Sequence, residues 1–570
     1  MVAILALLLT LATPVFAALT GDIEGTVFDK TGAVMTGARV TIKNSSSGAT
    51  RVVTTNQFGQ FSAPQLELGT YSITVEKDGF RTYTATAVVR SGEKTRLDTT
   101  MEVGRKDESV VVEAGAVPTL DVATAQVSDS LDAVTTVTLP NQARDPIAFA
   151  TLSPGIVPVN QDNSSFLGTG SFNSNGSRGR ANNITVDNII SSDLSTTGEA
   201  GTGTFVLEAV QEFKLITNNF DAEFGRNSGS QVQVLTKRGT NQFHGTAYWF
   251  HQNAFFNARD FFDTQIVNGA TEPGPAVPFI QNQGGFAAGG PIYKNHTFVF
   301  GHWEIDRTRG AGGAVTARVL TPAQAAGITD PTSLALFKQY GSPTSATGLI
   351  SNSAPNQTNA YSWSIRVDQL LRGGQDSLFV RYGENPITSA TPGLTFPSTT
   401  LAGFGATVTD LARTVSFGYT SVLTSSVINQ FRFGFGRDNP NFPANSPFPL
   451  GPFIQISGES GMGESPIIPQ GRTQNTFQYG DTLSWVKGRH TFKFGGDILR
   501  YQAPSVFDSR VRGVVSFASV AAFQAGTPTS WLQNVGDSHR HNFSLDHFWF
   551  VQDDYRLTDT LTLNLGFRLE

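Results

Sequence analysis

The sequence predicts a mainly β protein: an N-terminal seven-stranded β-sandwich, a small α+β unit, and roughly ten strands of a transmembrane antiparallel β-barrel that is incomplete in this chain. Two observations lead to this prediction. Phenylalanine occurs 43 times, glycine 58 times and methionine only 4 times, a bias toward residues of strands and turns over helix formers. From Thr240 onward, runs of about ten to thirteen residues alternate between apolar and polar side chains, as strands with one apolar and one wet face do.

The first 17 residues are predicted to be a cleaved signal peptide. The apolar run 2–11 is too short to cross a bilayer, and small residues just upstream of Ala18 suit cleavage there. One part of the pattern is missing, because no lysine or arginine precedes the apolar run. The alternative is a buried N-terminal helix, which Pro14 disfavours. We therefore expect an exported protein.

Composition excludes several function classes. The 570 residues carry a net charge of −6 and no cysteine, so there is no basic field for nucleic acid, no disulfide and no thiol chemistry. No later segment has the ~20 consecutive apolar residues that a membrane helix needs. If the chain enters a membrane after its signal peptide, it must do so as β-strands.

Residues 18–103 are predicted to form the sandwich, because seven short alternating runs are separated by turn residues. Tyr71, Ile73 and Val75 alternate with polar residues, so one face of that strand is core. Gly59 and Gly69 are expected to need positive φ angles. The pattern resembles the carboxypeptidase-regulatory-like domain, which implies a structural module without a catalytic zinc site. The residues that carry the resemblance are Gly25, Gly37, Ala38, Gly59, Phe61, Gly69, Tyr71, Gly79 and Phe80.

Residues 104–114, GRKDESVVVEA, are predicted to be a charged linker that ends in a β-branched strand. Val110, Val111 and Val112 could add a strand to a partner's sheet, which requires only backbone pairing and β propensity. An ordinary first strand of the next domain fits equally well.

Residues 115–240 follow as the small α+β unit, in which ITVDNI and EFKLIT are strand-like and residues 160–204 are rich in Asn, Ser, Gly and Thr.

Residues 241–570 are predicted to form part of an outer-membrane β-barrel. Tight turns alternate with long irregular loops, as they do in outer-membrane barrels, and aromatic residues gather at strand ends. The expected strands are 241–251, 295–305, 359–371, 375–385, 410–422, 427–437, 475–486, 490–502, 545–556 and 560–569. The expected long loops are 252–294, 306–358, 386–409, 438–474 and 503–544. The aromatic residues are Tyr248, Trp249, Phe250, Trp303, Trp363, Tyr382, Trp485, Trp549 and Tyr555.

The run EFGR…TKRGTNQFHG within residues 208–263 resembles the plug-to-barrel junction of Oar-like TonB-dependent outer-membrane receptors. The resemblance implies that residues 115–240 are a plug and that Val110, Val111 and Val112 form a TonB box for a TonB-type periplasmic energy-transducing protein. It also implies contact with outer-membrane lipid and uptake of a solute, such as a glycan, peptide or siderophore, into the periplasm. A structural role in the plug, as ion pairs against the barrel wall, is expected for Arg178, Arg180, Glu223 and Arg226.

The final run QDDYRLTDTLTLNLGFR resembles a mid-barrel signature of that family. Complete transporters of this kind close with ~22 strands, and roughly ten would enclose too narrow a lumen for a plug. We therefore expect the chain to be an N-terminal fragment of a longer protein or a truncated gene product.

No nucleotide-binding loop, nucleophile elbow or metal-protease motif occurs in the sequence. His539, His541 and His547 are the closest group of histidines, and a solvated loop explains them better than a metal site does. We expect no enzyme activity, no cofactor and no metal. Two alternatives to uptake remain: a surface adhesion protein, and a transducer that senses its ligand without importing it.

Overall fold

The computed structural model describes most of the chain as strands. The described residues are 20–104, 109–112, 124–141, 144–158, 172–192, 205–259, 264–267, 270–274, 276, 278–311, 315–352, 355–390, 404, 407–444, 449–558 and 561–570. The predicted signal peptide lies outside them. No helix in these ranges is both long and apolar enough to cross a membrane.

The N-terminal unit is a sandwich of two sheets, as predicted. One sheet is built on β1 (Thr20–Asp29), which pairs with β4 (Gln60–Glu67), β7 (Lys94–Arg96) and β8 (Thr99–Met101). The other has the order β3 (Thr50–Thr54), β2 (Arg39–Asn44), β5 (Gly69–Glu76), β6 (Thr82–Val89) and β9 (Ser109–Val112).

The last of the seven predicted runs, residues 94–103, is interrupted between β7 and β8. At the break, the Asp98 carboxylate accepts a hydrogen bond from the Thr26 amide at 2.8 Å. Gly25 faces the Leu97 carbonyl so closely that a Cβ would collide with it. Gly59 and Gly69 have φ angles of 67° and 136°, which confirms the expectation of positive φ.

A second unit, the inner domain (the described residues of 124–236), is built on a five-stranded sheet. Its order is β10 (Val127–Asp132), β15 (Val210–Asn218), β16 (Gln231–Thr236), β13 (Asn183–Val186) and β14 (Ile189–Ile190). The strands predicted from ITVDNI and EFKLIT are thereby confirmed. Short helices α2 (Ala133–Thr138), η1 (Pro146–Leu152), η2 (Gly179–Ala181) and η3 (Leu207–Ala209) and the hairpin β11 (Ile156–Pro158)–β12 (Phe172–Ser174) complete it. Its apolar core includes Ile147, Phe149, Leu207, Phe213, Leu215, Val232 and Val234.

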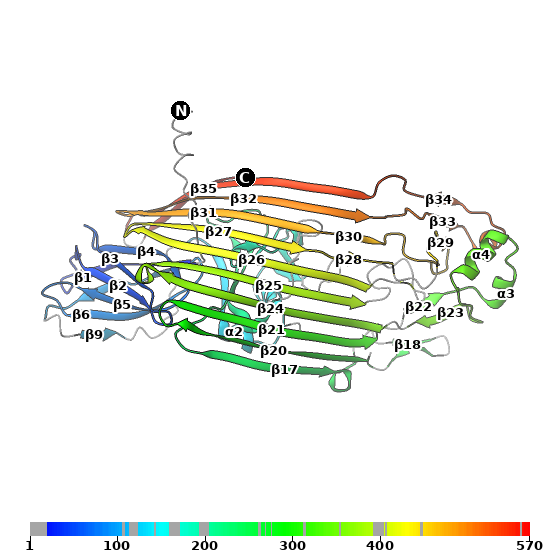
Figure 1. Cartoon of the computed structure of the whole chain (residues 1–570), viewed down its shortest axis with the longest axis horizontal. Helices are drawn as coiled ribbons and strands as arrows, with labels where there is room; N and C mark the ends of the chain where they lie inside the picture. The colour runs from blue at the N-terminus through cyan, green and yellow to red at the C-terminus, as the bar shows by residue number, and fades with distance from the viewer. Residues whose placement is uncertain are drawn as a thin grey trace, which may run out of the picture.

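The third unit is one large antiparallel sheet, the barrel sheet, which curves around the inner domain (Figure 1). Its long strands are β17 (His244–Asn253), β20 (Phe279–Tyr293), β21 (Thr297–Ala311), β24 (Pro355–Leu371), β25 (Asp376–Ala390), β26 (Thr407–Thr424), β27 (Val427–Asp438), β31 (Gln474–Lys487), β32 (His490–Phe507), β35 (His539–Arg556) and β36 (Thr562–Leu569). Short strands β28 (Asn441–Phe442) and β30 (Gln470–Arg472) extend it. One face carries exposed apolar side chains, among them Trp249, Phe286, Trp303, Ile365, Val380, Tyr479, Phe494, Trp549 and Phe567.

The prediction that residues 252–294 form a loop is wrong, because β20 occupies the end of that range. Its sequence, FIQNQGGFAAGGPIY, is rich in glycine and alanine, which have low strand propensity. The glycines are needed where aromatic rings cover the strand: a Cβ on Gly284 would collide with the Trp249 ring, and one on Gly290 with the Phe243 ring.

The two ends of the barrel sheet differ. The sandwich packs against the end with tight turns, and helices α3 (Pro322–Ala326) and α4 (Pro331–Gln339) lie at the other end (Figure 1). At that end the prediction of irregular loops is wrong in detail. Segments of four of the predicted loops pack around one shared apolar core, and we call this unit the loop domain. It contains α3 (Pro322–Ala326), α4 (Pro331–Gln339), α5 (Val520–Gln524), β22 (Val315–Arg318), β23 (Leu349–Asn352), β29 (Phe453–Ile456), β33 (Val514–Phe517) and β34 (Ser530–Leu532). The hairpin β18 (Thr264–Val267)–β19 (Ala270–Pro273) stands apart.

Candidate functional site

The sandwich is fastened to the barrel sheet by a buried ion pair. Lys94 Nζ lies 2.6 Å from Asp554 Oδ2, and only 6% and 3% of the two side chains are exposed. The Asn564 amide donates to the other Asp554 oxygen at 2.7 Å. Burial lowers the pKa of Lys94, but the carboxylates around it, Asp554 first and then Asp22 and Glu24, together raise the pKa above its ordinary value. Lys94 is therefore a charged lysine held by one partner from the barrel.

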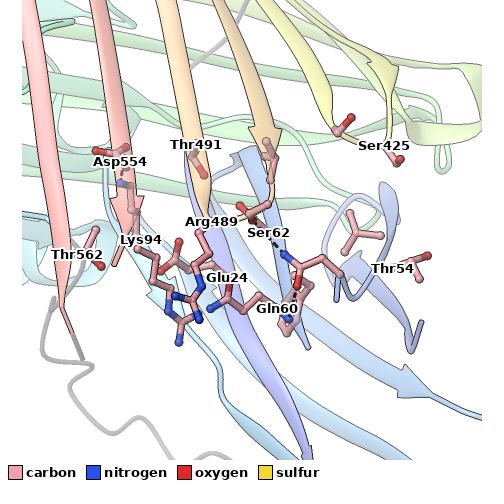
Figure 2. Close-up of a pocket in the computed structure, with 17 residues that line it drawn as sticks. Glu24, Thr54, Gln60, Ser62, Lys94, Ser425, Arg489, Thr491, Asp554 and Thr562 are labelled. Atoms are coloured by element: carbon pink, nitrogen blue, oxygen red, sulfur yellow. Dashed lines mark hydrogen bonds and ion pairs between the residues drawn. The ribbon is translucent and has the colours of Figure 1, made fainter. Parts of the chain in front are cut away.

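A polar cavity of about 200 Å³ lies beside this ion pair, between the sandwich and the tight turns (Figure 2). Glu24, Gln60 and Arg489 line it. Burial raises the pKa of Glu24, although the nearby Lys94 opposes the shift. A further hydrogen bond at this end runs from the Gln65 side-chain amide to the Ser484 hydroxyl at 2.7 Å.

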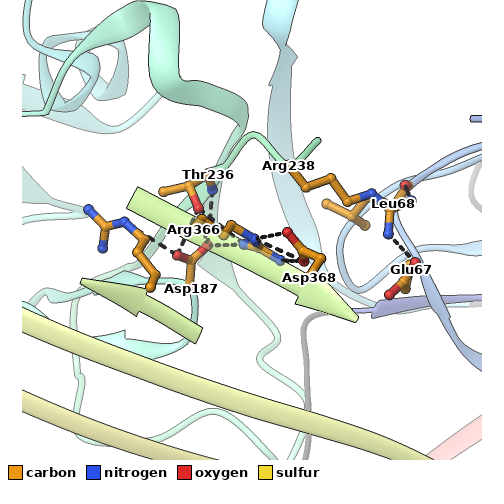
Figure 3. Close-up of polar contacts among 8 residues, drawn as sticks. Glu67, Leu68, Asp187, Thr236, Arg238, Arg366 and Asp368 are labelled. Atoms are coloured by element: carbon orange, nitrogen blue, oxygen red, sulfur yellow. Dashed lines mark hydrogen bonds and ion pairs between the residues drawn. The ribbon is translucent and has the colours of Figure 1, made fainter. Parts of the chain in front are cut away.

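The inner domain is held to the barrel sheet by a second charged cluster (Figure 3). Asp187, in the β13–β14 turn, accepts from the Thr236 amide at 3.0 Å and lies 3.4 Å from Arg366 Nη1 on β24. Arg366 Nη2 lies 2.8 Å from Asp368 on the same strand, and Arg381 Nε lies 4.0 Å from Asp187. The Asp187 side chain is fully buried and Arg366 is 12% exposed. Arg366 therefore compensates two buried carboxylates from two units of the fold.

Arg238 connects this region to the sandwich. Its guanidinium forms an ion pair with Glu67 of β4 and donates to the Leu68 carbonyl at 3.2 Å. Burial raises the pKa of Glu67, but Arg238 more than offsets this and holds it below its ordinary value. A cavity of about 260 Å³, lined by Lys237 and His244 among others, lies where the three units meet.

The opposite wall of the barrel sheet contacts the segment before β16. Glu223 lies 3.0 Å from Lys493 Nζ of β32. The Ala222 amide donates to Gln552 at 2.9 Å, and Arg568 donates to the backbone carbonyls of Ala222 and Glu223 at 3.2 Å. At the β14 edge, the Ile190 amide donates to Gln478 of β31 at 2.9 Å. The inner domain thus meets the barrel wall through many polar side chains. Two small apolar clusters add to them: Val206 and Ala209 pack with Ala287 and Phe300, and Ile190 packs with Leu499 and Phe548.

The sandwich also contacts the inner domain directly, through the turn between β6 and β7. The Ser91 amide donates to Glu212 Oε1 at 3.1 Å, and Lys214 Nζ donates to the Ser91 carbonyl at 2.6 Å. The Ser91 hydroxyl donates to Gln233 at 3.3 Å. We call these four residues the Ser91 contact, and none of them is more than 5% exposed.

We expect the free energy of unfolding to depend on pH through the Glu212 carboxyl of the Ser91 contact. Burial raises the pKa of Glu212 from 4.5 to about 7, although Lys214 and the Ser91 amide oppose the shift. Because the folded state holds the Glu212 proton more tightly than the unfolded state does, this group favours the folded state fully below pH 4.5. Its contribution to the free energy of unfolding is lost as the pH rises from 4.5 to about 7. The total effect is about 3 kcal/mol. We expect Glu212→Gln to flatten the pH dependence of the free energy of unfolding across this window, measured by urea unfolding; parallel curves for the two proteins would contradict this.

The structure separates the residues that the sequence singled out. Glu223 lies against Lys493, and the Arg226 amide donates to Glu570 at 2.8 Å. Arg178 and Arg180 are exposed beside or within η2, and the structure assigns them no ion pair among the described residues. Residues 110–112 lie in β9, which pairs in parallel with β6 at the edge of the sandwich.

Sequence reasoning missed the clusters around Arg366, Lys94 and Ser91. Alternation along β24 places Arg366 and Asp368 on the same face of the strand, but it does not show which residue of the inner domain lies opposite them. Ser91 lies in the turn before β7 and Lys94 is the first residue of β7, and no special sequence pattern marks either residue. Among the described residues, no group of three or more histidines and carboxylates is placed to hold a metal ion.

Comparisons with known proteins agree with this architecture. Residues 235–570 match the family model of the outer membrane beta barrel domain, and residues 22–102 match the carboxypeptidase regulatory-like domain. The chain is 26% identical over 273 residues to the TonB-dependent transporter Oar from Myxococcus xanthus, covering 45% of this chain and 24% of Oar.

Two solved structures share the fold. The outer membrane transporter YddB from Escherichia coli superposes with a TM-score of 0.53 and 10% identity, covering 77% of this chain and 56% of YddB. The siderophore receptor PirA from Acinetobacter baumannii gives a TM-score of 0.50 and 12% identity, with the same coverage of 77% and 56%. The chain thus spans a quarter of the curated relative and just over half of each solved structure.

Proposed function

Because this chain belongs to the outer membrane beta barrel family, with its barrel sheet in the outer membrane, we propose that it takes up a solute into the periplasm through a gate driven by a TonB-type partner. The observation that carries the proposal is the position of the inner domain against the barrel sheet. A compact unit with its own core lies against the concave side of a membrane sheet and is held there by polar contacts.

In this proposal residues 115–240 are the plug. Contacts made by ion pairs and amides can be exchanged for contacts with water when the plug moves, whereas an apolar seat would resist movement. The solute is a glycan, a peptide or a siderophore. Its specificity resides in the loop domain, since that unit stands at the end of the barrel sheet away from the sandwich.

The proposed partner segment is β9. We expect Val111→Pro to abolish binding of the C-terminal domain of a TonB-type protein, because proline removes an amide donor and fits poorly in a paired strand. Val111→Thr keeps the amide and the β-branched side chain, and is expected to bind as the unaltered protein does. The measurement is a pull-down from detergent-solubilised outer membranes. Equal capture of both variants would contradict the assignment of β9.

The uptake itself is tested in cells of the native host. Growth is compared with a ferric siderophore as the only iron source, and with an oligosaccharide or a peptide as the only carbon source. The proposal expects the Val111→Pro strain to lose growth on one of these solutes and the Val111→Thr strain to keep it. Normal growth of the proline strain on every solute that requires this gene would overturn partner-driven uptake.

A further inference from the structure

The sandwich meets the inner domain across a polar contact between two separate apolar cores. The sandwich core and the inner-domain core share no residue. Between them stands the Ser91 contact, which joins a backbone turn to a carboxylate, an ammonium and an amide. The two units can therefore part without exposing either core to water.

The Ser91 contact is also specific. Lys214 is only 1% exposed, and its 2.6 Å hydrogen bond ends on the carbonyl of Ser91. Gly92 completes the turn with a φ of 60°, and a Cβ there would lie 3.4 Å from Lys214 Nζ. A buried ammonium costs several kcal/mol unless its partners stay in place. While the sandwich is seated, the contact fixes β15 and β16, the central strands of the inner sheet.

The same sandwich is fastened independently to the barrel. The ion pair Lys94–Asp554 holds it on the tight-turn side, and Glu67 pairs with Arg238 in the segment that connects β16 to β17. The amide of Asn241, just before β17, donates to the Ser46 carbonyl at 3.0 Å. The sandwich thus bridges the barrel sheet and the inner domain, and neither can move away from it while these contacts and the Ser91 contact persist.

The proposed partner strand β9 belongs to this bridging unit. It pairs with β6 over Thr82–Ala85, and β6 ends at Val89, two residues before Ser91. A pull on β9 is therefore applied to the strand that leads into the Ser91 contact.

We propose that the N-terminal sandwich is a latch on the plug: the Ser91 turn must leave Glu212, Lys214 and Gln233 before the inner sheet can be remodelled. This inference rests on the proposed function, since it assumes that the inner domain moves. It assigns the sandwich a place in gating, as the element that is released first.

Single-molecule pulling on the full protein in lipid nanodiscs tests the latch. A biotinylated peptide inserted after Ala114 supplies the handle, and Ser46→Cys with Asn241→Cys supplies a lock. The natural chain contains no cysteine, so within one molecule an oxidised disulfide can join only these two positions. We expect the reduced protein to release the sandwich first and then extend the inner domain. Oxidation should remove the extension of the inner domain or shift it to higher force. Identical extension in both states would overturn the latch.

A second pair of variants removes the dependence on the disulfide. Lys214→Met deletes the ammonium of the Ser91 contact and is expected to lower the force of the first event. Lys43→Met, at an exposed lysine on β2, is the matched control and should leave it unchanged. Equal forces in the two variants also overturn the latch. The pulling assay uses neither partner nor solute, so a failed latch with intact partner binding leaves the proposed function standing.

Discussion

Replacing Arg366 with methionine is expected to weaken the seat of the inner domain by about 3–5 kcal/mol, the cost of removing one partner from a buried ion pair. The substitution preserves most of the side-chain volume but leaves Asp187 and Asp368 without the guanidinium that lies between them. Arg381 lies 4.0 Å from Asp187 and can compensate only one of the two carboxylates.

The measurement is pulse proteolysis with trypsin across a urea series, which reports opening at Lys237 and Arg238. Arg413→Met is the matched control, because Arg413 pairs with Glu384 at 2.8 Å but is 42% exposed. An exposed pair of this kind contributes about 0–1 kcal/mol. Arg366→Lys should fall between the two, since an ammonium cannot reproduce the forked contact. If Arg366→Met were no more destabilising than Arg413→Met, the cluster around Asp187 would not hold the inner domain.

Lys94→Met is expected to release the sandwich from the barrel sheet, again at a cost of about 3–5 kcal/mol. The change leaves Asp554, 3% exposed, with its hydrogen bond from Asn564 but without its cation. The pKa of Lys94 is raised above 10.5 by the carboxylates around it, so the lysine stays charged and the ion pair stays formed at physiological pH. Lowering or raising the pH within the physiological range therefore does not reproduce the effect of the substitution.

The double variant Lys94→Met with Asp554→Leu shows whether the lost stability comes from the unpaired Asp554 carboxylate or from other neighbours of Lys94. Replacing both charges by apolar groups is often neutral, so most of the lost stability should return. The readout is the temperature at which protease removes residues 20–104 from the membrane-bound protein. A double variant as unstable as Lys94→Met alone would show that the lysine acts through other neighbours.

The architecture was largely predictable because strand alternation and turn residues are local signals. Tyr71, Ile73 and Val75 face the sandwich core as their alternation indicates. The Gly-rich strand β20 was missed because its residues have low strand propensity on their own. Direction along the sheet could have revealed it: residues 241–251 and 295–305 both run away from the sandwich, so an antiparallel sheet needs a returning strand between them.

The site was less predictable, because its contacts join residues far apart in the chain. Arg366 and Asp187 are 179 positions apart, and Lys94 and Asp554 are 460 apart. Alternation indicated only that Arg366 and Asp368 share a face. Glu223 was singled out through a resemblance, yet no pattern in the sequence points to Lys493 as its neighbour.

The loop domain has a consequence for how this protein diversifies. Its core draws Leu320 and Tyr340 from one connection, Phe404 from a second, Ile454 from a third and Phe523 from a fourth. A change in any one of these connections is felt by the packing of the other three. We therefore expect substitutions at the packed positions of one connection to require compensating changes in the others.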